Sequence, residues 1–77
     1  MAEEIKIVDA RGLICPLPVL RARKALQGVP KGAAIEVLAT DPAALKDFPA
    51  FCAESGHALE ASREEGGVYR FTIRRAP

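Results

Sequence analysis

The spacing of hydrophobic and polar residues changes along the chain, and each change marks the boundary of an expected element. Hydrophobic residues alternate with polar ones over residues 4–9, 57–64 and 68–74, which predicts three strands. An apolar run over residues 33–40 predicts a fourth strand that is largely buried. The chain therefore supplies enough strands for a small sheet.

Residues 16–27 have the period of a helix instead. Gly28 ends this helix and Pro30 follows it, which is typical of helix C-termini. Its apolar residues form one stripe that should face the sheet, namely Pro18, Val19, Ala22, Ala25 and Leu26. Three polar residues lie on the opposite side, namely Arg21, Lys24 and Gln27.

A second helical region follows the buried strand. Asp41 and Pro42 predict its start, because Asp is a favoured N-cap and Pro suits the first helical position. Pro49 should interrupt it, since an internal proline removes a backbone donor. We therefore predict a short turn over residues 42–46 and a separate helix over residues 48–55. Gly56 closes that helix, and its core residues should be Phe48, Phe51 and Cys52.

These elements follow one another in the order βαβαββ. A strand, a helix and a strand in succession predict a parallel pair joined by a right-handed crossover. Residues 65–67, with two glycines, predict a hairpin between the last two strands. In the third strand, Leu59 and Ala61 are expected to share one face. We expect a single domain over residues 1–77, an α/β two-layer sandwich with two helices on one face of a four-stranded mixed sheet.

The stretch before the first helix carries the candidate chemistry. Pro16 and Pro18 both fit the first turn of a helix, which makes Cys15 the expected N-cap. A helix N-terminus stabilises an anion, so the thiol pKa should be lowered. Because the prolines donate nothing, the Leu17 N–H is the expected donor to the sulfur. The alternative is a small buried hydrophobe, but Cys is a poor N-cap, which favours a functional reason for its presence.

Few reactions suit a lone cysteine. Acyl transfer needs a base beside the thiol, and the one histidine, His57, is expected at the start of a strand. A dithiol oxidoreductase would need Cys15 and Cys52 to meet, which their expected positions disfavour. Two Cys and one His do not make a convincing zinc site. Attack of a thiolate on a sulfur atom needs no general base, so Cys15 is suited to carry a sulfane sulfur as a persulfide.

Composition and charge limit the expected cellular compartment and the classes of partner. The formal net charge of +1 gives no general attraction to nucleic acid, and no apolar run is long enough to cross a bilayer. The first four residues include two glutamates and lack a signal-peptide core. We expect a cytoplasmic protein with reduced cysteines, no cofactor, no metal, no membrane contact and no strong direct binding of nucleic acid.

The same stretch resembles the Cys-Pro-x-Pro signature of the TusA (SirA-like) sulfur-carrier family. The resemblance rests on Gly12-Leu13-Ile14-Cys15-Pro16-Leu17-Pro18 with Arg21, Arg23, Lys24 and Leu26, and on Asp9, Asp41-Pro42, Asp47-Phe48-Pro49, Cys52 and Gly56-His57. It implies the same fold and a sulfurtransferase that acts as a persulfide carrier. The implied donor is a cysteine desulfurase or another sulfurtransferase, and the implied acceptor is a protein of tRNA 2-thiouridine synthesis or of sulfur metabolism.

The candidate site thus has three parts. Cys15 is the catalytic residue, and the residues that support the helix N-terminus are Gly12, Pro16, Leu17 and Pro18. The expected partner-binding face consists of Leu17, Leu20, Arg21 and Lys24. Arg11 is a weaker candidate for raising the potential near Cys15, and Asp9 and Asp41 are expected to organise a loop and cap a helix.

An alternative from another class remains open. The basic helix face could belong to a non-catalytic regulatory or interaction module that binds protein or RNA. Such a module should tolerate Cys15→Ser, whereas a carrier should not. Cys52 is expected to be a structural thiol in the core.

Overall fold

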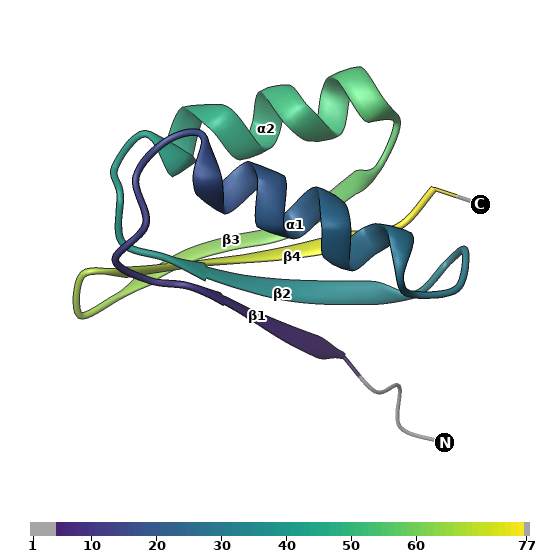
Figure 1. The fold of residues 1–77 in the computed structure, drawn as a ribbon, viewed down its shortest axis with the longest axis horizontal. Coiled ribbons are helices and arrows are strands. Elements are labelled where there is room, and N and C mark those ends of the chain that lie inside the picture. The colour runs from purple at the N-terminus through teal and green to yellow at the C-terminus, as the bar shows by residue number, and fades with distance from the viewer. Residues whose placement is uncertain (1–4, 77) are drawn as a thin grey trace.

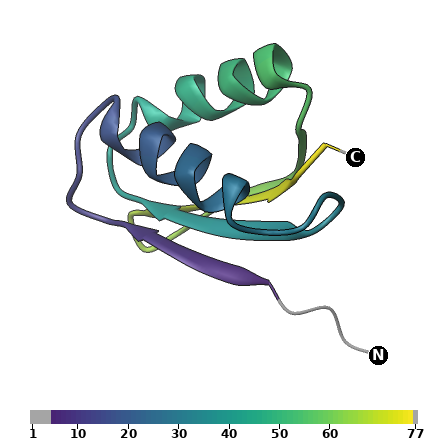
Figure 2. The same ribbon diagram turned by 45° about the vertical axis from the view of Figure 1, so that its right-hand side comes forward.

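The computed structural model describes residues 5–76 and places helices on one face of a sheet (Figure 1). The elements are β1 (Lys6–Ala10), α1 (Leu17–Gln27), β2 (Ala34–Ala39), α2 (Ala44–Ser55), β3 (Ala58–Glu65) and β4 (Val68–Arg74). The strand order is β1-β2-β4-β3, with β1 and β2 parallel and the other pairs antiparallel. Both helices cover the same face of this sheet (Figures 1 and 2), which confirms the predicted mixed sandwich. Glu4, expected to begin the first strand, lies outside the described residues.

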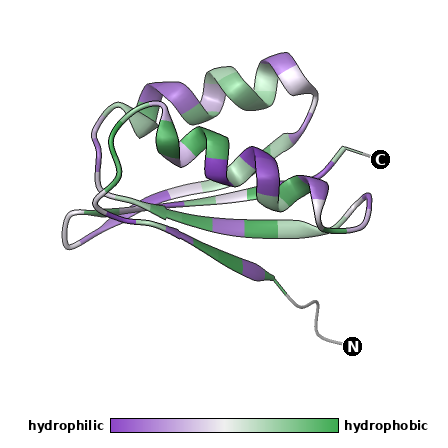
Figure 3. Ribbon diagram, in the orientation of Figure 1, coloured by the Kyte–Doolittle hydropathy of each residue, from purple (hydrophilic) through white to green (hydrophobic). Residues whose placement is uncertain are grey.

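The apolar stripe of α1 packs on the sheet as its spacing predicts. Pro18, Ala22, Ala25 and Leu26 are buried, and Val19 is partly buried against the core. Arg21, Lys24 and Gln27 are exposed on the other side. Figure 3 shows the resulting division between hydrophobic and hydrophilic segments around the helices.

The central strands and α2 supply the rest of the core. Ile35 and Val37 of β2 lie opposite Ile73 and Phe71 of β4, and all four are fully buried. The Phe71 ring stacks on Phe48 of α2, with a centroid separation of 4.5 Å. Stacked aromatic side chains of this size contribute much of the burial in a small core.

Strand β3 contains an irregularity that alternation did not predict. Leu59 pairs with Ile73, but Ala61 pairs with Thr72, so one residue of β3 has no counterpart on β4. Ile73 points into the core, and its neighbour Thr72 therefore points to the other face. The expectation that Leu59 and Ala61 share a face is wrong, because a β-bulge between them reverses the alternation.

Helix α2 is continuous, whereas the sequence suggested a turn and a separate helix. It runs from Ala44 to Ser55 with Pro49 inside it. Ala44, Phe48 and Cys52 are buried at a spacing of four residues, so a single helix directs all three towards the sheet. Pro49 and Leu45 lie on the exposed side, where water can hydrate the Leu45 carbonyl that the proline leaves without a donor. Tertiary burial of one stripe thus outweighs the cost of the internal proline.

The turns follow the glycines. Gly66 and Gly67, which join β3 to β4, have φ angles of 57° and 83°. A two-residue hairpin with positive φ at both positions matches the twist of the flanking strands. This confirms the predicted hairpin.

Candidate functional site

Cys15 lies in the loop between β1 and α1, and its side chain is exposed. Cys52 is buried on α2 and only 4% exposed. Neither cysteine forms a disulfide bond. The prediction of one exposed thiol and one core thiol is therefore confirmed.

The start of α1 is one residue later than the sequence suggested. Pro16 is the N-cap, Pro18 is in the first turn, and no side chain caps the helix. The Leu17 N–H donates to the Ile14 carbonyl at 2.9 Å, and the Leu20 N–H donates to the Pro16 carbonyl at 3.1 Å. The expected cap at Cys15 is wrong, because the Ile14–Leu17 turn makes the Pro16 carbonyl the first acceptor of the helix. For the same reason the Leu17 N–H is not available to the sulfur.

The loop that carries Cys15 is anchored by the loop that follows β2. Asp41 Oδ2 accepts a hydrogen bond from the Cys15 N–H at 2.8 Å, and Thr40 Oγ1 accepts one from the Gly12 N–H at 2.9 Å. Because β1 and β2 are parallel, their carboxyl ends lie together, and these two loops meet. Gly12 has a φ of 78°, a conformation that costs other residues ~1–2 kcal/mol. Gly12 thus supplies the backbone conformation that this loop requires.

The prediction that Asp41 is the N-cap of α2 is wrong, because the helix begins two residues later than expected, with Ala43 as its N-cap and no side-chain cap bond. Asp41 instead holds the turn that precedes the helix. Its Oδ1 accepts a hydrogen bond from the Ala43 N–H at 3.0 Å. The backbone N–H groups of Ala43 and Cys15 together lower the pKa of the Asp41 carboxyl. A single ionised side chain therefore organises the start of α2 and holds the backbone of Cys15.

The charges around Cys15 reverse the expected effect on its thiol. A hydrogen bond to the Asp47 side chain raises the pKa of Cys15, and desolvation and the negative charges of Asp47 and Asp41 raise it further. A thiol that donates to a carboxylate is favoured in its protonated form. The prediction of a lowered pKa is wrong, because it considered α1 alone and omitted the carboxylates near the start of α2.

Cys15 borders a hollow of about 310 Å³ between the two helices. Asp47, Phe51 and Glu54 of α2 line it on one side, and Arg23 of α1 lines it on the other. The sequence did not predict that Arg23 or Asp47 lies beside the thiol. Nothing in the local sequence points from Asp47 to the thiol, because α2 is distant from Cys15 along the chain.

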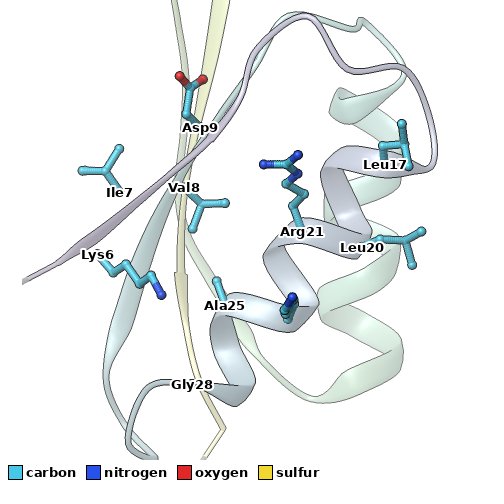
Figure 4. A pocket seen from close by; sticks show the side chains of 10 residues that line it. Lys6, Ile7, Val8, Asp9, Leu17, Leu20, Arg21, Ala25 and Gly28 are labelled. Atoms are coloured by element: carbon cyan, nitrogen blue, oxygen red, sulfur yellow. The ribbon is translucent and has the colours of Figure 1, made fainter.

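The predicted partner-binding residues lie along a different groove. Leu17 and Leu20 are 44% and 49% exposed, and with Arg21 and Lys24 they line a groove of about 830 Å³ between α1 and β1 (Figure 4). None of the four lines the hollow beside Cys15. The structure thus brings these residues together, as their helical spacing predicts, but on another side of α1.

Arg11 does not act as a free cation near the thiol. Its guanidinium donates to both carboxylate oxygens of Asp9 at 2.8 Å. Hydrogen bonds from the Arg11 side chain and backbone lower the pKa of Asp9 to about 2. Asp9 therefore organises this end of the loop, as the sequence suggested.

His57 and the remaining acidic residues form no metal centre in the part of the chain that the structure describes. No group of three or more His, Cys, Asp or Glu side chains in residues 5–76 is placed to hold a metal ion. His57 Nδ1 instead accepts a hydrogen bond from the Ala76 N–H at 2.9 Å. Within the same residues, no helix has the length and apolar character needed to span a bilayer.

The fold and the site define a small α/β protein with one exposed thiol on a loop that precedes a helix. The family model described as "Sulfurtransferase TusA" matches residues 6–75, and the chain belongs to this sulfur-carrier family.

Relatives and a solved structure agree with this assignment. The chain is 46% identical to the sulfur carrier protein TusA of Allochromatium vinosum over 76 residues, which cover 99% of this chain and 100% of that one. It is 41% identical to TusA of Pseudomonas paraeruginosa over 69 residues, 90% of this chain and 87% of that one. A crystal structure of a SirA-like protein from Desulfitobacterium hafniense superposes with a TM-score of 0.81 at 28% identity. That superposition covers 95% of this chain and 100% of the other.

Proposed function

We propose that this protein accepts a sulfane sulfur on Cys15 as a persulfide from a donor protein and passes it to an acceptor thiol. The observation that carries the proposal is the exposure of Cys15 on a loop, while Cys52 is buried. The sulfur-carrier relatives support the reaction class. We take the donor to be a cysteine desulfurase or another sulfurtransferase, and the acceptor to be a protein of tRNA thiolation or of sulfur metabolism.

The transfer is balanced without a cofactor. The Cys15 thiolate attacks the outer sulfur of the donor's cysteine persulfide, and a new S–S bond forms on Cys15. The old S–S bond breaks, the donor sulfur leaves with the bonding electrons, and it takes up the proton that the Cys15 thiol lost. A second attack, by the acceptor thiolate on the outer sulfur of Cys15, repeats the exchange. No net oxidation or reduction accompanies either step.

The carboxylates near Cys15 give the free carrier a resting state. The hydrogen bond to Asp47 and the negative charge of Asp41 raise the pKa of the Cys15 thiol and so favour its protonated form. A protonated thiol is a poor nucleophile, so the unbound carrier reacts slowly with stray electrophiles and oxidants. A donor whose site is positively charged would offset these carboxylates, and the thiolate would form where it is needed.

Intact-mass measurement after loading tests the proposal. With a cysteine desulfurase and cysteine, the wild type should gain one sulfur atom that a reductant removes. Cys52→Ser is the matched control and should load as the wild type does, whereas Cys15→Ser should not load. A Cys15→Ser variant that still gains the sulfur would show that Cys15 is not the carrier. A regulatory module would instead retain its biological effect in that variant.

We also propose that the exposed face of α1 contacts the donor. Ile14, next to Cys15, is 71% exposed, and Leu17 and Leu20 continue this apolar surface onto α1. Figure 3 shows the hydrophobic segment leading into the helix. Exposed apolar side chains provide contact area, while Arg21 and Lys24 steer an acidic partner.

Charge reversal tests this contact face. Arg21→Glu with Lys24→Glu should slow loading by the donor protein and change stability by only about 0.5 kcal/mol per site, because both residues are exposed. Lys31→Glu, on an exposed turn, is the control with the same kind of charge change. Loading by inorganic polysulfide, which needs no docking, should be unaffected. Equal rates for the double variant and the wild type at low salt would contradict this part of the proposal.

The expected cellular compartment follows from the same chemistry. We propose that the protein works in the cytoplasm, because a carrier thiol has to be kept reduced between successive loadings.

A further inference from the structure

We propose that the groove between α1 and β1 binds an extended acidic segment of the sulfur-donor protein, which pairs with the free edge of β1 as a fifth strand. This inference rests on the proposed function, because a relay requires the donor to dock near Cys15. It goes further than the contact face of α1, since it names the conformation and the charge of the segment that docks.

The first argument is the state of the two sheet edges. β1 lies at one edge and pairs in unbroken register with β2, from Lys6 opposite Ile35 to Ala10 opposite Ala39. β3, at the other edge, has a bulge that contains Glu60 and is followed by three charged residues, namely Arg63, Glu64 and Glu65. Bulges and charges discourage strand addition, whereas a regular edge offers its unpaired N–H and C=O groups. β1 is therefore the edge that is open to another strand.

The second argument is the apolar surface beside this edge. Val8 and Ala25 are nearly buried in the groove, while Ile7 is 54% exposed and Leu20 is also exposed. A strand added next to β1 would direct every second side chain towards α1 and the others towards the face that carries Ile7. Apolar side chains of such a strand would cover Leu20 on one face and Ile7 on the other. The surface thus fits an extended segment with alternating side chains.

The third argument is the charge of the groove. Lys6, Arg21 and Lys24 line it, and within residues 5–76 Asp9 is the one carboxylate that lines it. Asp9 is held by Arg11 at 2.8 Å. In Figure 4 the Arg21 side chain extends from α1 towards β1. The groove is therefore cationic and favours acidic residues, whereas a second copy of this chain would bring Lys6 against the same cations.

A peptide titration tests the docking separately from sulfur transfer. The probe is a blocked eight-residue peptide in which glutamate alternates with valine, and the readout is the backbone amide spectrum of the full chain. The peptide should shift and protect the amides of β1. The affinity of a peptide with lysine in place of glutamate should be lower by about tenfold or more. Two further peptides keep the same side chains, but each is N-methylated at every second residue, one at odd and the other at even positions. Only one of these two sets of backbone N–H groups faces β1, so one of the two peptides should lose about tenfold or more in affinity.

Variants of the chain complete the test. Arg21→Glu with Lys24→Glu should weaken peptide binding about tenfold, the effect expected when two exposed ion pairs are replaced by two repulsions. Lys31→Glu is the matched control and should bind like the wild type. Cys15→Ser should also bind the peptide normally. Saturating peptide should slow loading by a cysteine desulfurase but leave loading by polysulfide unchanged.

The outcomes separate this inference from the proposed function. If the donor loads Cys15 but the acidic peptide leaves the β1 amides unprotected, the strand addition is wrong while the carrier function stands. The same conclusion follows if both N-methylated peptides bind like the parent, or if β1 instead mediates a dimer of this chain. If the peptide binds as described but Cys15 is never loaded, the carrier function is wrong.

Discussion

Replacing Pro49 with alanine should stabilise the protein. Pro49 lies inside α2, where its ring removes the N–H that would bond to the Leu45 carbonyl. An internal proline costs ~3 kcal/mol relative to alanine in a helix. Because proline also restricts the unfolded chain, its removal returns ~0.4–1 kcal/mol to the unfolded state. The net gain should be about 2 kcal/mol, which is large against the ~4–11 kcal/mol expected for a domain of this size.

The site of the change allows a clean measurement. Pro49 is exposed, so the shorter alanine side chain leaves no cavity in the core. Urea unfolding followed by circular dichroism gives the free energy of unfolding and the slope with denaturant. The midpoint of thermal unfolding should rise by about 10 °C, since 1 kcal/mol shifts a small domain by ~4–8 °C.

Pro42→Ala is the matched control for the unfolded-state effect. Pro42 is exposed and precedes α2, so no helical hydrogen bond is gained when its ring is removed. The free energy of unfolding of this variant should fall by ~0.4–1 kcal/mol, whereas that of Pro49→Ala should rise. If both variants shift the free energy of unfolding in the same direction and by the same amount, the argument that Pro49 weakens α2 is wrong.

Three further outcomes are expected. Asp47→Asn should lower the pKa of Cys15, because the largest cause that raises it is the hydrogen bond to Asp47; the iodoacetamide rate profile should then move to lower pH, and an unmoved profile would contradict this. In the wild type, peptide mapping should find Cys15 alkylated well before Cys52, whose burial raises its pKa; equal rates would refute the burial argument. Phe48→Ala should cost ~3–5 kcal/mol in urea unfolding, since Phe48 is fully buried; a loss below about 1 kcal/mol would show that the core refills the space.

Local patterns were sufficient for several elements. The stripe of α1 and its end at Gly28 follow from side-chain spacing and backbone conformation, which act within one or two turns of a helix. The hairpin at Gly66 and Gly67 depends only on two residues that adopt positive φ. These features were predicted correctly because the forces that determine them act between near neighbours in the chain.

Other features depended on burial, which the local pattern does not describe. Pro49 predicted a break in α2, but the buried positions of Phe48 and Cys52 keep the helix whole. The bulge between Leu59 and Ala61 likewise depends on how β3 meets β4. In α2 the local rule was overruled by packing against the sheet, which contributes more free energy than a single helix preference. In β3 the local rule failed because alternation along one strand does not describe its pairing with the next.

The sequence by itself determined that Cys15 lies close to the start of a helix, and the family motif around it points to sulfur transfer. Only the tertiary structure decided which charges surround the thiol. Asp41, 26 residues away, binds the backbone of Cys15, and Asp47 is the largest cause of the raised pKa of its thiol. Since charges act over a few ångströms whatever their separation along the chain, the pKa of Cys15 is set by the packing of α2 beside the loop that holds this cysteine.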